Sequence, residues 1–181
     1  FYLDQRDNRR KVGLYCRDRE VLDAFCYTGG FGVCALSLGA KSVVGLDSSR
    51  QALRMAVDNV RLNGLCGASE YIEGNAFHLL RGFRDQGRHF DVVILDPPKF
   101  AFSRAQVQRA TRGYKDINML GMRLLRPGGI LCTFSCSGLV SADLFQKVVF
   151  GASVDVGRQV RIIDRLAQAS DHPVPLTFPE S

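Results

Sequence analysis

The sequence contains no tryptophan, no CxxC pair and no long apolar run among its 181 residues. A membrane-spanning helix needs roughly 18 consecutive apolar residues, so none is expected here. The six cysteines stand at positions 16, 26, 34, 66, 132 and 136, without the spacing typical of zinc ligands or of a disulfide framework. Scattered thiols in apolar stretches are typical of reduced cytosolic proteins. We therefore expect a cytoplasmic protein that holds no metal and no disulfide.

Positive charge exceeds negative charge, because 24 Lys and Arg face 18 Asp and Glu and leave a net charge of +6. Such a surplus suits a polyanion such as nucleic acid, and it is also common on plain solvated surfaces. The length suits a single domain, residues 1–181. Because the chain opens at FYLDQRDNRR without an initiator Met or an apolar signal core, we expect this domain to come from a longer protein.

Short β-rich runs alternate with helical patterns along most of the chain. This alternation predicts an α/β fold in which crossover helices connect the strands of a mostly parallel sheet. Seven strands are predicted, at 21–25, 42–46, 70–73, 91–96, 130–136, 160–166 and 175–178.

Three helices can be placed from caps and apolar stripes. Ser48-Ser49-Arg50-Gln51 forms a capping box with Ser48 as its N-cap, and Asn63-Gly64 supplies a left-handed end, which predicts a helix over 49–62. A longer stripe predicts a helix over 107–124, and a third covers 145–152. These stripes are typical of helices that cover a sheet.

Ligands of open α/β sheets bind beyond the carboxyl ends of the strands, so the residues that follow each strand are the candidates for a site. The first strand leads into DAFCYTGGFG, whose glycines permit a tight turn but do not form the GxGxxG motif of dinucleotide enzymes. S-adenosylmethionine carries only a carboxylate, so it needs less room at this turn than the pyrophosphate of a dinucleotide does. Asp47 ends the second strand, where a carboxylate can hold ribose hydroxyls; NAD enzymes share this feature, and an Asp can also simply begin a helix.

Asp96-Pro97-Pro98 closes the fourth strand, and two prolines cannot continue a ladder, so the backbone must leave the sheet rigidly at Asp96. This turn either presents a carboxylate to a ligand or is only a stiff exit. The fifth strand places Cys132 in its body and Cys136 at its end, so only Cys136 reaches the ligand side. The cysteines expected to pack as small buried hydrophobic residues are Cys16, Cys34, Cys66 and Cys132.

Together the stretches FYLDQRDNRR, VLDAFCYTGGFGVCALSLGAKSVVGLDSS, FDVVILDPPKFAFS, RGYKDINMLGMRLLRPGGIL and SCS resemble the catalytic half of the RlmI-type bacterial large-subunit rRNA cytosine-5 methyltransferases. The resemblance covers nearly the whole chain. It implies a Rossmann-like class I methyltransferase fold with helices on both faces of the sheet, S-adenosylmethionine as donor and a cytosine of ribosomal RNA as acceptor. That family carries an amino-terminal PUA-type domain which this chain lacks. The oligomeric state stays open, with a homodimer as one arrangement.

The resemblance also assigns roles to residues. Cys136 would add to carbon 6 of the cytosine, and Asp96 would stabilise the charge that develops at ring nitrogen 3. Asn75 and Ala76 would flank the adenine, but Asn75 stands where relatives commonly have Asp (GNAF for GDAF), so the acidic contact to the adenine amine becomes a carboxamide. Gly138 stands where relatives often have His (SCSGLV for SCSHH), so a proton-transfer role for a His is not carried over. The residues implied to bind the cofactor are Gln5, Arg6, Phe25, Cys26, Tyr27, Gly29, Asp47, Ser48, Asn75, Ala76 and Asp96.

A cytosine must be unstacked to reach a thiol beside the methyl donor. Pro97, Pro98, Phe100 and Tyr114 are expected at the substrate, with Phe102 as a further stacking candidate. Candidates for phosphate contacts are Arg104, Arg109, Arg112 and Lys115. Two other functions remain open: methylation of an exocyclic amine or ring nitrogen, which needs no thiol, and binding of cofactor or RNA without catalysis.

Overall fold

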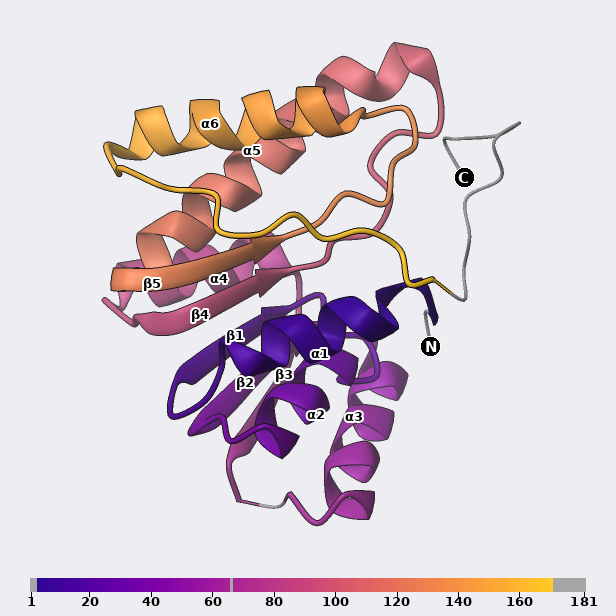
Figure 1. Cartoon of the computed structure of the whole chain (residues 1–181), viewed down its shortest axis with the longest axis vertical. Helices are drawn as coiled ribbons and strands as arrows, with labels where there is room; N and C mark the ends of the chain where they lie inside the picture. Colours follow the sequence, from indigo (N-terminus) through magenta and orange to yellow (C-terminus); the bar gives the residue numbers. More distant parts are fainter. Residues whose placement is uncertain (1–2, 66, 171–181) are drawn as a thin grey trace.

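The computed structural model describes residues 3–65 and 67–170, and its centre is one parallel sheet of five strands (Figure 1). The strand order β3-β2-β1-β4-β5 reverses beside β1, because the chain first builds outward to β3 and then returns to place β4 on the other side. The strands are β1 (Glu20–Ala24), β2 (Ser42–Asp47), β3 (Ser69–Glu73), β4 (Phe90–Leu95) and β5 (Leu125–Thr133).

Helices cover both faces of this sheet (Figure 1). One face carries α1 (Arg6–Leu14), which follows the short 3-10 helix η1 (Leu3–Gln5), together with α2 (Gly30–Ser37) and α3 (Arg50–Leu62). The other face carries α4 (Ala76–Asp85) and α5 (Val107–Leu124), which follows η2 (Arg104–Gln106). The last helix, α6 (Ala142–Val156), packs on α5 rather than on the sheet.

Alternation along the strands divides the core into two apolar layers. Leu22 and Leu46 face the side of α4 and α5, where Leu80 and Ile117 pack on them. The neighbouring residues of the same strands, Val21 among them, face the side of α1 to α3. The inner strands β1, β2 and β4 bury side chains on both faces and are therefore mostly apolar, as is usual for the middle of a parallel sheet.

The structure confirms the α/β fold with a parallel sheet and helices on both faces, but within the described residues the sheet has five strands and not seven. Residues 160–166 form no strand and are mostly exposed, because no strand pairs with them. The predicted strand at 175–178 and Cys66 lie outside the described residues. The fifth strand spans 125–133 instead of 130–136, so it ends before Cys136.

The N-cap of α3 also differs from its prediction. Ser49, not Ser48, is the N-cap, and its side chain accepts a hydrogen bond from the backbone N–H of Ala52. The helix therefore begins at Arg50 and ends before Asn63 and the left-handed Gly64, as predicted. The predicted helix over 107–124 coincides with α5.

Among the described residues no helix is long and apolar enough to cross a membrane. In the same part of the chain, no group of three His, Cys, Asp or Glu side chains is placed to hold a metal ion. The cysteines that the structure describes are all free thiols.

Candidate active site

The carboxyl ends of β1 and β4 lie side by side where the strand order reverses, which is the place where open α/β sheets bind ligands. Two backbone hydrogen bonds hold the loops together just beyond the strands. The N–H of Asp96 donates to the carbonyl of Ala24 (3.4 Å), and the N–H of Cys26 donates to the carbonyl of Leu46 (2.9 Å). The loops after β1, β2 and β4 thus meet at one edge.

The loop after β1 has an unusual backbone. Phe25 (φ 64°) and Tyr27 (φ 50°) lie in the left-handed region although they carry side chains, and Gly29 (φ 76°) follows. Such residues are uncommon and cost on the order of 1 kcal/mol or more each, so they persist where the surroundings demand that conformation. Gly29 is also required by packing, because a Cβ there would lie 2.9 Å from the Cβ of Ala56. Strain and close packing concentrate where a ligand loop is expected.

Asp47 fixes this loop from the end of β2. Its Oδ2 accepts a hydrogen bond from the N–H of Tyr27 (2.9 Å), and its Oδ1 accepts one from the N–H of Ser49 (2.8 Å). Each carboxylate oxygen can accept a second hydrogen bond, and the half-buried side chain remains open to solvent. Ser48 is exposed beside it. The arrangement leaves an oriented carboxylate able to accept from a pair of hydroxyls.

The start of α4 contributes residues from the carboxyl end of β3. Asn75 is the N-cap, and its Oδ1 accepts a hydrogen bond from the N–H of His78 (3.2 Å). Ala76 is buried behind it, and the ring of the next residue, Phe77, packs edge-on against Phe25 with 6.4 Å between centroids. Asn75 is thus a helix cap whose exposed amide still faces solvent.

Cys136 and Asp96 form the pair with the clearest chemistry. The thiol donates to Oδ1 of Asp96 across 3.8 Å. Burial raises the pKa of Asp96 to about 6, and the negative charge of Asp4 acts in the same direction. Desolvation by surrounding protein, followed by the charge of Asp96, raises the pKa of the Cys136 thiol to about 12, although the residue is open to solvent on one side. At neutral pH the pair is therefore a neutral thiol beside a carboxylate.

Arg9, which lies near this pair, was not predicted from the sequence as a site residue. Arg9 is only 8% exposed, packs against Gly30 at the start of α2, and has its pKa lowered by burial, while the charges of Asp4 and Asp96 oppose that shift. A signal was present, because Gln5, Asn8 and Arg9 are spaced for one helical face with Val12. All four are buried, so this polar face turns inward.

Gln5 and Arg6, which the sequence placed at the cofactor, lie on different sides of the chain start. Gln5 is buried, and its Oε1 accepts a hydrogen bond from Asn8 (2.8 Å). Arg6 is exposed, and its Nε donates to Asp7 (3.1 Å).

Asp23 is a further unpredicted acid, and it is completely buried under the loop after β1. Its Oδ2 accepts a hydrogen bond from the N–H of Gly32 (3.0 Å), and burial raises its pKa to about 8. The hydrogen bond from Gly32 opposes this rise in pKa, and the charges of Asp96 and Asp47 contribute to it. Its position inside β1 made it indistinguishable from a strand residue in the sequence.

The loop after Asp96 is tied to the loop that carries the thiol. Ser137 is buried, its Oγ accepts from the N–H of Ala101 (3.3 Å), and it is hydrogen-bonded to the hydroxyl of Tyr114 (3.2 Å). Tyr114 is 0% exposed and packs on Phe100 at 4.6 Å between ring centroids. This burial corrects the expectation that Tyr114 stacks on a substrate, because a stacking ring must be accessible. Pro97 is buried, and Pro98 is exposed.

The basic residues near the start of α5 differ in their availability. Arg104, Arg109 and Arg112 are exposed, whereas Lys115 is half-buried and forms an ion pair with Asp155 (2.8 Å). Only the first three remain well placed to meet phosphates.

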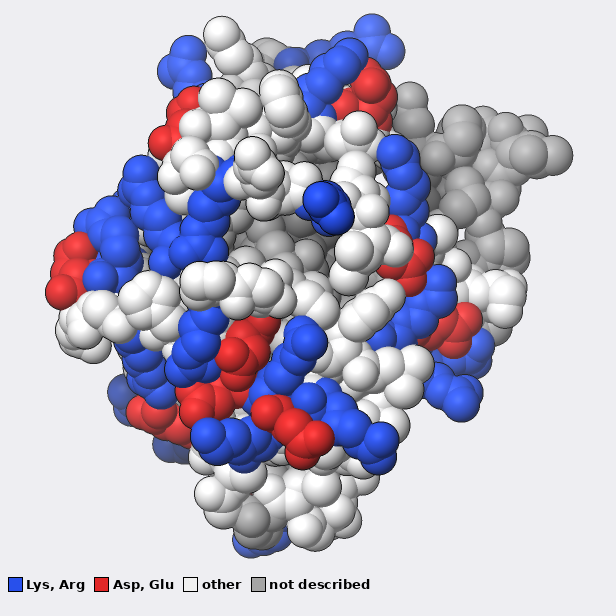
Figure 2. Space-filling model, turned by 60° about the vertical axis from the view of Figure 1, so that its left-hand side comes forward, with Lys and Arg blue, Asp and Glu red and all other residues white. Residues whose placement is uncertain are grey.

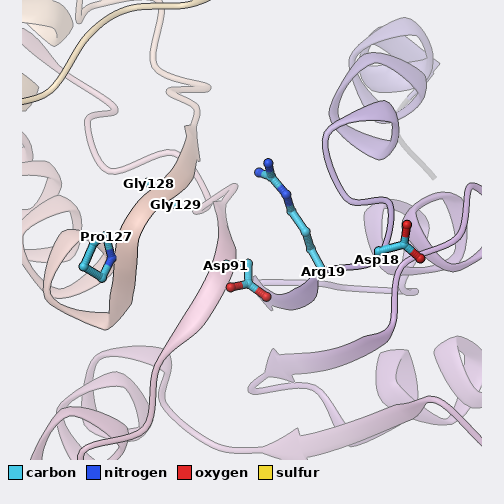
Figure 3. A pocket seen from close by; sticks show the side chains of 6 residues that line it. All are labelled: Asp18, Arg19, Asp91, Pro127, Gly128 and Gly129. Carbon is cyan, nitrogen blue, oxygen red and sulfur yellow. The ribbon is translucent and has the colours of Figure 1, made fainter.

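Two cavities lie outside this pair of loops. One of about 330 Å³ lies between α1, α2 and α3 and includes Arg9, Thr28 and Gly30. Another of about 250 Å³ lies at the opposite, amino-terminal edge of the sheet, where Arg19 and Asp91 lie between Asp18 on one side and Pro127, Gly128 and Gly129 on the other (Figure 3). Figure 2 shows the molecule turned toward that side, with a hollow in its surface and acidic side chains among the basic ones. This second cavity is remote from the strand ends that carry Asp47 and Asp96.

The fold and the candidate site place this chain in the class of doubly wound α/β proteins. The loop after its first strand has a strained backbone, and an acid ends its second strand. A family model described as S-adenosylmethionine-dependent methyltransferase matches residues 1–173. The chain belongs to this family, whose cofactor is S-adenosylmethionine.

Relatives and solved structures agree with that membership. Two proteins named "Ribosomal RNA large subunit methyltransferase I", from Aeromonas hydrophila and Shewanella amazonensis, are 54% and 55% identical over 99% of this chain. The chain spans 46% of the length of either relative. The structure of the methyltransferase SMU.776, complexed with SAH, superposes with a TM-score of 0.86 at 22% identity and covers 99% of this chain and 47% of its own. That likeness supports the fold.

Proposed function

We propose that this chain is the catalytic part of a large-subunit ribosomal RNA methyltransferase that transfers a methyl group to carbon 5 of a cytosine through a covalent cysteine intermediate. The observation that carries the proposal is the contact between Cys136 and Asp96 at the sheet edge, with Sγ 3.8 Å from Oδ1. Relatives at 54% and 55% identity named as large-subunit rRNA methyltransferases support the substrate class. A ribosomal RNA substrate also supports the proposal of a cytoplasmic location.

The residues at the strand ends fit an adenosyl ligand. The oxygens of Asp47 each accept one backbone N–H and can each accept a further hydrogen bond, which suits the two ribose hydroxyls. The strained backbone at Phe25 and Tyr27 suits a loop that must approach a ligand closely. The residues proposed to hold the cofactor are Gln5, Arg6, Phe25, Cys26, Tyr27, Gly29, Asp47, Ser48, Asn75, Ala76 and Asp96.

The protein's own part in the chemistry begins with a proton. The Cys136 thiol is neutral near pH 7, because its pKa is raised to about 12, whereas Asp96, with a pKa of about 6, is mostly ionised. Asp96 accepts the thiol proton while sulfur bonds to carbon 6 of the cytosine, and the electron pair of the 5,6 double bond moves toward nitrogen 3. Protonated Asp96 then gives that proton to nitrogen 3, so one carboxylate serves both steps.

When bound, S-adenosylmethionine supplies an electrophilic methyl group to carbon 5, and its sulfur keeps the electron pair of the bond that breaks. Loss of the carbon 5 proton then restores the double bond as the cysteine sulfur leaves from carbon 6, and Asp96 carries the nitrogen 3 proton back to that sulfur, which restores the thiol. No His follows Cys136 in SCSGLV, so we assign this proton acceptor to no residue. In the rigid turn Pro97-Pro98, the exposed Pro98 is proposed to contact the base, while Phe100 packs on Tyr114. Ser137 ties this loop to the nucleophile loop through Ala101.

We expect this chain alone to methylate RNA poorly, so the test is methylation of unmodified 23S ribosomal RNA with S-adenosylmethionine by the chain joined to an RNA-recognition domain of the resembling family, followed by mass mapping of the nucleosides. We expect 5-methylcytidine. RNA with 5-fluorocytosine at the target should also trap the protein covalently, because fluorine cannot leave as a proton does. A methylated amine or ring nitrogen without any adduct would establish the alternative reaction, for which Cys136 is unnecessary. Cofactor binding without methyl transfer would leave a binding module.

A further inference from the structure

Phe102 is the most exposed aromatic side chain near the proposed nucleophile, with 74% of its surface accessible. It stands six positions after Asp96, in the loop between β4 and η2. Exposure of so large an apolar ring is unfavourable in water. A ring that stays exposed beside a reactive pair is therefore a candidate for ligand contact.

The loop holds Phe102 in a defined place relative to Cys136. Ala101 is completely buried, and its N–H donates to Oγ of Ser137 (3.3 Å), the residue directly after the thiol. The N–H of Phe102 donates to Oε1 of Gln106 (2.8 Å) at the end of η2. Two consecutive backbone N–H groups are therefore hydrogen-bonded to side chains of other segments. These bonds fix the backbone that carries the exposed ring.

Two aromatic residues of this loop contact different surroundings. Phe100 packs inward, with its ring centroid 4.6 Å from that of Tyr114 and 6.3 Å from that of Phe77. Ala101 between them is buried, and Phe102 faces solvent. Phe100 thus secures the loop to the core, while Phe102 remains available to an external ring.

One cation lies close to the exposed ring, and two exposed arginines follow it in the chain. Nζ of Lys99 lies 6.0 Å from the centroid of Phe102, at the limit of a cation–π contact. Arg104 is exposed two residues further on, and Arg109 is exposed on α5. An accessible aromatic ring among cations is the combination that single-stranded nucleic acid needs, since bases stack on the ring and phosphates meet the charges.

We propose that Phe102 stacks on an unpaired RNA base next to the nucleotide that enters the Cys136 site, with Lys99 beside the neighbouring phosphate. This inference rests on the proposed function, which supplies RNA as the ligand. Extrusion of the target cytosine breaks the stacking between that base and its neighbour. Stacking of the neighbour on Phe102 would replace the lost contact and stabilise the RNA with the cytosine extruded. The ring acts on binding and not on the chemistry, so it is a positioning residue.

The test compares four forms of the full 181-residue chain: wild type, Phe102→Ala, Phe102→Trp and Phe150→Ala. Phe150 is a matched control, because it is a 65% exposed phenylalanine on α6. Binding is measured by fluorescence anisotropy at low salt with a labelled single-stranded oligocytidine RNA. A second labelled strand of equal length, made of abasic ribose phosphates, keeps the phosphates and lacks every base.

We expect Phe102→Ala to bind oligocytidine roughly 5- to 150-fold more weakly, the range for loss of one stacked base. It should bind the abasic strand as wild type does, and Phe102→Trp and Phe150→Ala should bind both strands as wild type does. Equal affinity of wild type and Phe102→Ala for oligocytidine would overturn the inference, as would a loss that is the same for both strands. A change of oligomeric state in Phe102→Ala with unchanged RNA affinity would instead assign the ring to a second copy of the chain and also overturn it.

The inference and the proposed function can fail separately. Methylation of 23S ribosomal RNA by the wild type together with unchanged binding by Phe102→Ala would remove only the stacking role. Absence of both methylation and RNA binding in the wild type would remove the proposed function and the stacking role with it. A selective rise in KM for RNA in Phe102→Ala, with kcat and cofactor affinity unchanged, supports a positioning role.

Discussion

The thiol of Cys136 donates a hydrogen bond to Asp96, with Sγ 3.8 Å from Oδ1, across a separation of 40 residues. The thiol follows β5 and the carboxylate follows β4, and these strands are parallel neighbours at one edge of the sheet. Burial, followed by the charge of the carboxylate, raises the pKa of the thiol, and the carboxylate can accept the thiol proton, so the pair is suited to proton transfer that accompanies nucleophilic attack.

Cys136→Ala should abolish methyl transfer and leave affinity for S-adenosylmethionine within about threefold, because the thiol acts on the base and not on the donor. Radiolabelled methyl transfer and calorimetry measure the two quantities. Full methylation by Cys136→Ala would contradict the covalent mechanism.

Cys132→Ala is the matched control for that substitution. Cys132 is 7% exposed and packs in the layer of the core that faces α1 to α3. Its replacement should keep methyl transfer and lower the free energy of unfolding by roughly 1 kcal/mol. Urea denaturation gives that value, and loss of activity in a folded Cys132→Ala would place this thiol in the mechanism.

The pH dependence of methyl transfer should follow Asp96. The carboxylate form accepts the thiol proton, and its pKa is raised to about 6, so the rate should fall as pH drops through about 6. Asp96→Asn cannot accept the proton and should lose roughly 100-fold or more in kcat. Single-turnover rates from pH 5 to 8 test this; a flat profile would assign the proton to another acceptor.

Asp47→Ala should weaken binding of S-adenosylmethionine by roughly 1.5 to 3 kcal/mol, the range for a charged acceptor lost from hydroxyl donors. Some of that loss would come from the loop, because Asp47 also accepts the N–H of Tyr27. Asp58→Ala is the control, since Asp58 is an exposed acid on α3 whose partner is Arg61. An unchanged dissociation constant in Asp47→Ala would exclude this carboxylate from the site.

Asp23 should make the fold less stable at higher pH. Its pKa is raised from 3.8 to about 8 in the folded state, so between these values the folded chain binds more protons than the unfolded chain, and stability falls as pH rises. Asp23→Asn keeps an acceptor for the N–H of Gly32 without the charge. Urea unfolding should show that Asp23→Asn raises the free energy of unfolding relative to the wild type more at pH 8 than at pH 5. The same difference between variant and wild type at both pH values would refute the ionisation of a buried Asp23.

Local patterns were enough for most of the elements. The apolar stripe of 107–124 and the Asn63-Gly64 end of α3 appear where predicted, because helix periodicity and caps depend on neighbours within one or two turns. The strand predicted at 130–136 is present as β5 with bounds 125–133, whereas the one predicted at 160–166 does not form. A strand exists only if a partner pairs with it, and local propensity does not supply one.

The position of the proposed site residues at the strand ends was also predictable from the sequence, since parallel strands bring their carboxyl ends to one edge. Asp47 and Asp96 both lie there, each directly at the end of its strand. Tyr114 was misjudged, because a helical stripe does not reveal which of its aromatic residues the adjacent loop will cover.

The order of residues thus determined the α/β alternation, the apolar faces of the helices and the chemical groups available at each strand end. Only the tertiary structure decided which of those groups meet: β4 and β5 pair, so Cys136 reaches Asp96, while Asp23 and Arg9 become buried beneath and beside the ligand loop. The physical reason is that periodicity acts over a few residues, whereas proximity and desolvation are set by strand order and packing across the whole chain.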